Sequence, residues 1–423
     1  MENYLFIFIY YLFIMELQNM DDLKNLTLDQ IAWKMQTMEE LQTFIKRVTG
    51  PMIEMMLQSE MDEHLWYKKH SPEWYNTWNS RNGTSKKTIL TGNGKIEIEV
   101  PRDRTSDFEP KIIGKYQTKT SEIEDKIINM YGLGLTTSDI QKHIMDIYWS
   151  DISKELVSNI TDKIIPELQE WQGRMLSKFY PIIYLDAIHF KIRENSKVES
   201  HWVYIVLWID ITGHKEILGF YVGDAESGSF WQWVCNNLSN RWVEDICIAC
   251  VDGLAGFWTA IKNIFPEVTI QRCVIHQIRY SMQYISSADT EAFMKDLKSI
   301  YQATTLEIAE KNLTRLEDTW KKAYPISVNS WKKNWPDLSA YFTYSYELRK
   351  IIYTTNTIEG FNRQIRKVTK NRWVFPTKMS LEKLLYLATK NITEKWKQPI
   401  QNWGKILGQL EAFFPGKVEK YLR

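Results

Sequence analysis

The stretch between Pro181 and about Tyr284 constrains the fold of this chain more than any other. Three runs rich in aromatic and β-branched residues lie within it, at residues 181–193, 201–210 and 214–223. Turn-forming residues separate the three runs, which predicts a three-stranded meander. Residues 227–238 then space their apolar side chains as a helix does, and residues 245–253 return to a strand pattern that ends at a glycine. This order of β, β, β, α and β predicts an α/β domain.

Two aspartates lie within or at the end of these apolar strands. Asp186 is in the middle of the first run, and Asp252 directly precedes the glycine that ends the fourth strand. A carboxylate in an apolar strand is unfavourable unless its charge is compensated. If the two strands are neighbours, the carboxylates lie side by side, and a divalent cation is a common way to keep both ionised. The alternative is that each aspartate caps a turn.

A third acid begins a basic helix further along the chain. A helix starting near Asn356 puts Glu359 in its first turn, where the helix dipole favours a carboxylate. Polar and basic side chains follow at helical spacing, namely Asn362, Arg363, Arg366, Lys367 and Lys370. This arrangement suits a metal ligand placed beside a phosphate-binding face. The alternative is a first-turn glutamate followed by a solvated basic stripe.

The three acids together predict metal-dependent phosphodiester chemistry. Asp186, Asp252 and Glu359 offer oxygen ligands of the kind that magnesium prefers. Two such ions activate the attacking oxygen and stabilise the leaving oxygen of an in-line displacement. The sequence offers neither a covalent nucleophile with its base nor a Walker-type phosphate loop. We therefore expect the core of a metal-dependent nuclease.

Affinity for nucleic acid has to come from local patches, because the formal net charge is only +1. Between Lys68 and Lys119 there are 11 Lys and Arg against 6 Asp and Glu. Turn residues at 81–83 and strand patterns at 86–90 and 94–101 predict a small β-element. Phosphate contacts are expected from Arg81, Arg102 and Arg104. A solvated surface is the alternative.

Helical patterns surround this β-element. One helix is predicted up to about Val48, a break at residues 49–51, and a second helix over 52–67, as a packing or dimerisation element. Residues 120–131, 132–135 and 136–145 follow the helix-turn-helix plan, whose second helix can enter a major groove. Such helix pairs are also common as plain packing units. Residues 151–178 are mainly helical in pattern.

The N-terminus and the cysteines bear on where the protein is located. Residues 4–15 are apolar but too short to span a bilayer, without a basic flank or a cleavage site, so we expect translation from a start codon placed too early. A membrane tether is the alternative. Four cysteines cluster in one region of a long chain with no other sign of secretion, which favours a reducing cytoplasm.

Ordered motifs along the chain carry a family resemblance. They are Glu60–Leu65, Arg81–Gly83, Val100–Arg104, Tyr184–Ala187, Ala249–Leu254, Gln271–Arg279, Tyr353–Glu359, Lys383–Leu387 and Pro399–Trp403. With them the chain resembles the bacterial mutator-type insertion-sequence transposases, a DDE family with a ribonuclease H-like catalytic domain. The resemblance covers nearly the whole chain after the first twenty or so residues. One departure is Trp66, where relatives usually carry a small residue.

The resemblance implies a role for particular residues. Asp186, Asp252 and Glu359 correspond to the catalytic triad that holds Mg²⁺, for which Mn²⁺ is a possible substitute. Cys273 and His276 match the family's Cys-x-x-His signature and are expected beside the acids. The implied partners are double-stranded DNA, as element ends and target, and further copies of the chain in a homodimer or higher oligomer. A bacterial cytoplasmic protein associated with the nucleoid, without a membrane partner, is expected.

Two rival functions stay open at this point. A decayed or domesticated copy would occupy DNA without cutting it. A zinc-dependent nucleic-acid binder is suggested by the spacing of Cys247, Cys250, Cys273 and His276, although positions three apart in a strand face opposite sides.

The patterns also predict a division of the chain. The expected parts are a non-native extension (1–20), a helical region (21–67), a DNA-binding region (68–178), a ribonuclease H-like core (179–285), an all-helical insertion (286–350) and a C-terminal catalytic helix with a helical tail (351–423).

Overall fold

The structure, a computed structural model, describes most of the 423 residues. The described ranges are 37–72, 78–92, 94–148, 150–224, 227–253, 256–353 and 356–422. They form two compact units, the first containing the described residues up to Lys126 with Gln141–Ser153, and the second containing Ile127–Ile140 and the chain from Lys154 onward. The predictions for residues 1–20, for the start codon and for the helix up to residue 36 fall outside the described residues. No helix in the described part is long and apolar enough to cross a membrane.

In the first unit, helix α4 (Met38–Leu65) packs on a two-stranded sheet. The predicted helix break at residues 49–51 was wrong, because α4 continues through Pro51. Pro51 has no N–H to give the helix, but packing offsets that loss. Gly50 lies directly against Ile96 of the sheet, and Leu57, about two turns further along, joins the same apolar core. Tertiary contacts on both sides of the proline therefore keep the helix continuous.

The two-stranded sheet is an antiparallel hairpin of β1 (Arg81–Thr91) and β2 (Gly94–Asp103), which confirms the predicted β-element. The turn predicted at residues 81–83 was wrong. Those residues begin β1, and the strand register shifts between Arg81 and Thr84. Gly83 has a φ of 71°, so its lack of a side chain allows this irregularity within the strand.

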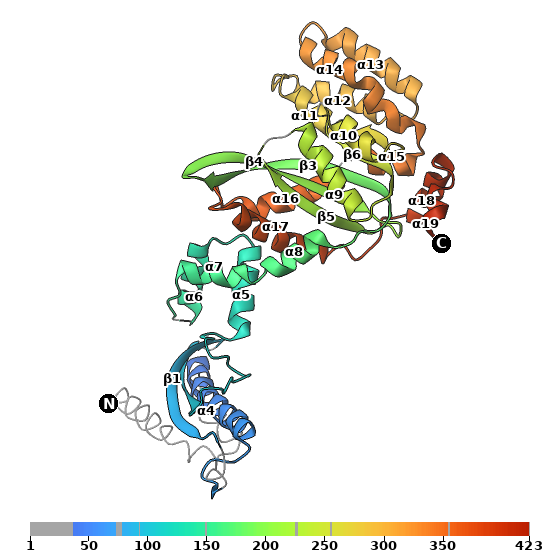
Figure 1. The fold of residues 1–423 in the computed structure, drawn as a ribbon. Helices are drawn as coiled ribbons and strands as arrows, with labels where there is room; N and C mark the ends of the chain where they lie inside the picture. Colours follow the sequence, from blue (N-terminus) through green and yellow to red (C-terminus); the bar gives the residue numbers. More distant parts are fainter. Residues whose placement is uncertain are drawn as a thin grey trace. The chain divides into compact units, whose positions relative to one another are not determined.

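The second unit is built around a five-stranded sheet (Figure 1). Its strands are β3 (Phe179–Glu194), β4 (Lys197–Ile209), β5 (Lys215–Gly223), β6 (Asp245–Val251) and β7 (Thr269–Arg272). Their order is β5-β4-β3-β6-β7. The first three strands pair antiparallel, as the predicted meander requires, whereas β6 and β7 run parallel to β3. The predicted α/β class is confirmed.

Helices cover both faces of this sheet. On one face, α9 (Gly228–Asn240) and α10 (Phe257–Ile264) share an apolar core with strand residues such as Leu185 and Val206. On the other face, α16 (Asn356–Thr369) packs against β3 and α17 (Lys378–Thr393) packs against β5. Because side chains alternate along a strand, Asp186 points to the face opposite Leu185, towards α16.

A helical segment follows the last strand. Helix α11 (Val274–Met282) leads into α12 (Thr290–Tyr301), α13 (Leu306–Trp320), α14 (Pro325–Leu338), η2 (Ser339–Thr343) and α15 (Tyr346–Ile352). Helices are thus the only regular elements within residues 286–350, all of which are described, as the sequence predicts. The buried indole of Trp331 donates to the hydroxyl of Ser281 at 2.9 Å, and this bond fixes α14 against α11. Helices α18 (Trp403–Phe413) and α19 (Lys417–Leu422) complete the chain.

The predicted helix-turn-helix is present as α5 (Ser121–Gly132) and α6 (Thr137–Tyr148), followed by α7 (Lys154–Asp162) and α8 (Ile165–Gly173). Its turn contacts the chain that follows α16 in the second unit. Arg372, just after α16, donates to the carbonyl of Leu135 and lies 4.2 Å from the ring centroid of Tyr131. The turn between α5 and α6 therefore has a packing role. This role is independent of what the exposed face of α6 contacts.

Gly134, in this turn, is expected to tolerate no side chain. Its φ is 97°, and a Cβ placed there would lie 2.1 Å from the carbonyl oxygen of Val368 on α16. We expect Gly134→Ala to lower the free energy of unfolding by more than about 1 kcal/mol, measured by chemical denaturation. Gly408→Ala is the control, since its Cβ meets no atom within 4 Å and it lies in helix α18. Equal stability of Gly134→Ala and the unchanged chain would contradict the packing role.

Candidate active site

The strand register brings two of the three predicted acids together. Leu185 of β3 pairs with Val251 of β6, so Asp186 and Asp252 are the next neighbours across the same pair of parallel strands. Asp186 is buried, whereas the side chain of Asp252 is 38% exposed. Each aspartate accepts a hydrogen bond from the next backbone N–H, at 2.9 Å from Ala187 and 2.6 Å from Gly253.

Helix α16 connects the third acid to this pair. Glu359 lies in its first turn, and Asn362 lies three residues later on the same side of the helix. The side-chain amide of Asn362 donates from Nδ2 to Oδ2 of Asp186 at 2.5 Å. Asn362 is buried, and its Oδ1 has no hydrogen-bond partner among the described residues. The helix that carries Glu359 is therefore tied directly to Asp186.

Two basic side chains of α11 balance the charge of the acids. His276 lies between the aspartates, with Nε2 3.8 Å from Oδ1 of Asp186 and Nδ1 3.9 Å from Oδ1 of Asp252. One turn later, Nη2 of Arg279 lies 3.1 Å from Oε2 of Glu359. Cys273 begins the helix by accepting from the backbone N–H of His276 at 3.4 Å, so the Cys-x-x-His signature positions the imidazole.

The pKa values of Asp186 and His276 are shifted by burial and by the neighbouring charges. Burial raises the pKa of Asp186 to about 6, and repulsion from Asp252 and Glu359 adds to that effect, whereas His276 and the Ala187 N–H oppose it. Burial lowers the pKa of His276, but attraction to Cys273 and to both aspartates outweighs burial and raises it to about 10. The imidazole is therefore a cation at neutral pH.

A wide cleft opens beside Asp252. Its volume is about 1350 Å³. Its polar lining includes Asp252, Arg272, His276, Arg279, Lys333, Asn334, Asp337 and Arg366. The cleft is too large for a small metabolite to fill, and its lining is mainly polar and cationic. Such a cleft suits an extended anionic substrate.

A second groove, of about 660 Å³, runs between α16 and β3. It is lined by Ile188, His189, Phe190, Arg363, Gln364, Arg366, Lys367, Thr369 and Lys370. All four of its predicted DNA-contacting cations are exposed, and none forms an ion pair with another described residue. They are therefore available for phosphates.

The three cations predicted in the first unit differ from one another. Arg102 and Arg104 are exposed. Arg81 is instead mostly buried, forms an ion pair with Asp62 of α4, and lies 5.7 Å from the ring centroid of Tyr67. Its guanidinium thus links α4 to β1. The predicted contact of Arg81 with DNA stays a prediction.

The donor atoms of the acidic site suit magnesium. Three carboxylates and the unpaired Oδ1 of Asn362 are all hard oxygen ligands. In the part of the chain that is described, however, neither these acids nor the cysteine set brings ligand atoms of three residues within 4.8 Å of one another. Burial also raises the pKa of Cys247 to about 12 and that of Cys250 well above its ordinary value, which disfavours the thiolates that zinc requires.

Comparison with known proteins assigns the family. A family model described as "Transposase, Mutator family" matches residues 21–399. The chain belongs to the Mutator family of transposases. A probable transposase for an ISRM3-like insertion sequence element of Sinorhizobium fredii is 40% identical over 85% of this chain and 90% of its own length. The transposase for insertion sequence element ISRM3 of Rhizobium meliloti is 39% identical over the same shares of the two chains.

More distant relatives extend the comparison. The transposase for insertion sequence element IS1201 of Lactobacillus helveticus is 31% identical to this Mutator-family transposase, over 83% of this chain and 95% of its own. Among solved structures, the Drosophila P element transposase strand transfer complex gives a TM-score of 0.36 at 10% identity, covering 65% of this chain and 92% of that one. That score is too low to support an argument about the fold.

Sequence reasoning about this Mutator-family transposase missed two contacts of the site. Helical spacing groups Asn362 with the phosphate-binding cations, whereas in the structure it bonds Asp186. Arg279, which is not among the predicted site residues, pairs with Glu359. A signal was present for both, because each lies three residues after a proposed site residue in a helix. Which acid a helix faces, however, is set by tertiary packing.

Proposed function

We propose that this transposase cuts and joins DNA at the ends of an insertion sequence, with Asp186, Asp252 and Glu359 as its catalytic carboxylates. The hydrogen bond from Asn362 to Asp186 carries this proposal, because it ties the Glu359 helix to the aspartate that neighbours Asp252. The sheet order, an antiparallel meander continued by two parallel strands, supports a ribonuclease H-like core. As an enzyme acting on chromosomal DNA, it would work at the nucleoid in the bacterial cytoplasm.

The proposed chemistry has two steps. Water attacks a phosphorus atom at the element end, the bond to the 3′ oxygen breaks, and a proton completes the free 3′-hydroxyl. That hydroxyl then attacks a target phosphodiester and loses its proton, the bond from phosphorus to the target 3′ oxygen breaks, and a proton completes the new 3′-hydroxyl of the target strand. Mg²⁺, or Mn²⁺ in its place, would be held by the three carboxylates and would supply Lewis-acid stabilisation of the attacking and leaving oxygens.

Other residues of the chain bind and orient the DNA in this proposal. The exposed cations Arg363, Arg366, Lys367 and Lys370 contact backbone phosphates along α16. His276 and Arg279 offset the negative charge of the acids in the metal-free protein. Because two element ends are joined to one target, the working form is at least a dimer. The alternative, a copy that binds DNA without cutting it, is disfavoured by the complete set of acids.

A cleavage assay tests the proposal. The purified full chain is incubated with DNA that carries the inverted repeats flanking its coding region. We expect nicked and joined products with Mg²⁺ or Mn²⁺, and none when EDTA removes the ions. Glu359→Gln is the control for contaminating nucleases and should give no product. Tight binding of the end DNA without cleavage in either ion would instead support the inactive, DNA-occupying alternative.

A further inference from the structure

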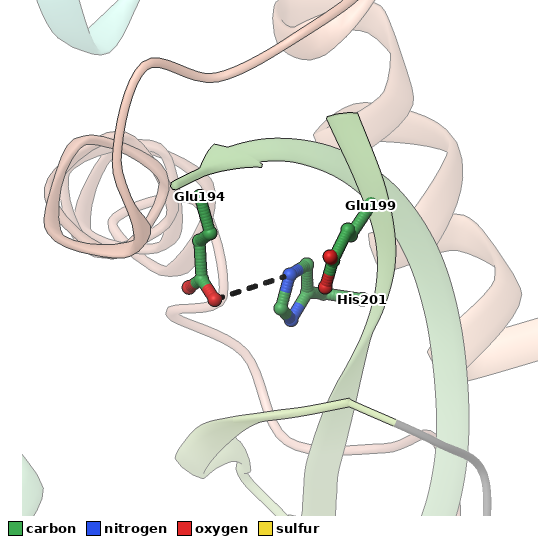
Figure 2. A group of neighbouring side chains, drawn as sticks. All are labelled: Glu194, Glu199 and His201. Carbon is green, nitrogen blue, oxygen red and sulfur yellow. Dashed lines mark ion pairs between the residues drawn. The ribbon is translucent and has the colours of Figure 1, made fainter. Parts of the chain in front are cut away.

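A second group of acidic residues gathers at the far end of the meander. Asn195 and Ser196 both have positive φ, 47° and 64°, and form the tight turn that fixes the β3–β4 register. In that register Glu194 pairs with Lys197, and Glu199 pairs with Ile192. Because cross-strand partners share a face and side chains alternate along a strand, Glu194, Glu199 and His201 all point to one side of the hairpin. Figure 2 shows the three side chains turned towards one another.

His201 is buried in an unusual state. The residue is only 2% exposed, yet neither ring nitrogen makes a hydrogen bond to any described residue. Leaving buried polar atoms unpaired is unfavourable, and a ligand would relieve it. The ring nitrogens face acids instead, with Nε2 3.9 Å from Oε2 of Glu194 and Nδ1 3.1 Å from Oδ1 of Asp224, and neither contact forms a hydrogen bond.

We propose that Glu194, Glu199 and Nε2 of His201 bind a divalent transition-metal ion of the zinc class. One ligand atom from each of the three lies within 4.8 Å of the other two. Ligands about 2.1 Å from one zinc ion are roughly 3.4 Å apart in a tetrahedral arrangement, so closure needs shifts of about 1 Å. Glu194 is 42% exposed at its side chain and Glu199 is exposed, which leaves both carboxylates free to make that shift.

Asp224 completes the arrangement from the other side of the ring. It follows Gly223, the residue of β5 that pairs with Trp202, and so it lies beside His201. A carboxylate at one ring nitrogen commonly orients a histidine whose other nitrogen binds a metal. Contact of Asp224 with Nδ1 therefore leaves Nε2, on the Glu194 side, as the ligand atom.

This site is separate from the proposed catalytic acids. Glu194 lies eight residues beyond Asp186 on β3, which corresponds to about 26 Å along a strand. Its ligand set also differs, because an imidazole with two carboxylates suits zinc or manganese, whereas magnesium prefers oxygen ligands alone. The two sites are thus distinguishable by metal and by mutation.

A metal here would hold the ends of the strands together. The ion joins the last residue of β3 to β4, and Asp224 adds the end of β5. The chain after α16 rests on the same part of β3, since Phe375 donates to the carbonyl of Lys191 at 2.8 Å and accepts from the N–H of Arg193 at 2.9 Å. The ion would therefore stabilise the end of β3 that contacts the segment after α16.

Zinc binding to the full chain tests the site. Titration calorimetry with ZnCl₂ is run on the unchanged chain, on D186N/D252N, which removes the proposed catalytic ligands, and on E194Q/E199Q. We expect D186N/D252N to keep one zinc site, and E194Q/E199Q to lose at least about tenfold in affinity for it. Zinc should raise the Tm of D186N/D252N, and this rise should be lost when E194Q/E199Q is added to that variant.

Two controls make the outcome decisive. E291Q/E310Q removes two exposed carboxylates from the helical insertion and should bind zinc as the unchanged chain does. Because Glu194 and Glu199 lie at the surface, E194Q/E199Q should fold normally, with an unchanged Tm in EDTA. Zinc affinity of E194Q/E199Q equal to that of the unchanged chain, or loss of all zinc binding in D186N/D252N, would overturn the proposal.

Discussion

Replacing Asp186 with asparagine is expected to abolish DNA cleavage and strand transfer, with a loss on the order of a thousandfold or more in rate. The introduced amide would keep the shape of the side chain and can still bond Asn362, but it cannot offer an ionised oxygen beside Asp252. DNA binding should persist, because the exposed cations of α16 are untouched. The measurement is a cleavage assay on end-containing DNA beside a binding assay on the same DNA.

The same substitution should raise stability when no metal is present. The pKa of Asp186 rises from 3.8 to about 6 on folding, chiefly through burial. Between about pH 4 and pH 6 the folded protein therefore binds more protons than the unfolded chain, and the free energy of unfolding falls as pH rises. Asp186→Asn removes this pH-dependent loss of stability. In EDTA at pH 7 the variant should gain at most roughly 3 kcal/mol, which corresponds to the rise of the Asp186 pKa from 3.8 to about 6 and already includes the opposing attraction to His276. The gain should vanish towards pH 4.

Asp337→Asn is the matched control for this prediction. Asp337 lines the same cleft as Asp252 but is not one of the three acids. We expect Asp337→Asn to cleave DNA within a few fold of the unchanged chain. Undiminished cleavage by Asp186→Asn would remove Asp186 from the proposed catalytic set.

The central sheet was predictable from sequence because its signals are local. Aromatic and β-branched runs set the strands, and residues such as Asn195 and Ser196 adopt the positive φ that a two-residue hairpin turn requires. The pairing of Asp186 with Asp252 follows once β6 is placed beside β3. That placement needed only the expectation that the two strand carboxylates lie side by side.

Features that depend on tertiary packing were not predictable in the same way. Pro51 signals a helix end by its own chemistry, but contacts of Gly50 and Leu57 with the hairpin keep α4 continuous. The bond of Asn362 to Asp186 spans 176 positions, so no local pattern announces it. His201 likewise looks like an ordinary strand residue until its burial without a hydrogen-bond partner is known.

Removing positive charge from α16 is expected to weaken DNA binding strongly. Arg363, Lys367 and Lys370 are exposed and make no ion pair with another described residue, so their replacement by glutamine should leave the fold intact. Each phosphate contact contributes about −0.9 to the slope of log K against log salt. The variant R363Q/K367Q/K370Q should therefore show a slope shallower by roughly 3, and near 0.1 M salt an affinity lower by on the order of a hundredfold.

The slope of log K against log salt distinguishes a phosphate-binding face from one that is only solvated. An affinity measured at one salt concentration cannot make that distinction. K295Q/K298Q/K311Q removes the same charge from exposed positions of the helical insertion, so it controls for the change in net charge. If α16 contacts phosphates, only the α16 variant changes the slope, because counterions are released only where the DNA lies. Equal slopes for both variants would mean that α16 carries a solvated stripe, and the DNA would have to be held elsewhere on the chain. Arg366 is left in place because it lines the cleft beside Asp252, so that binding can be lost without altering the acids themselves.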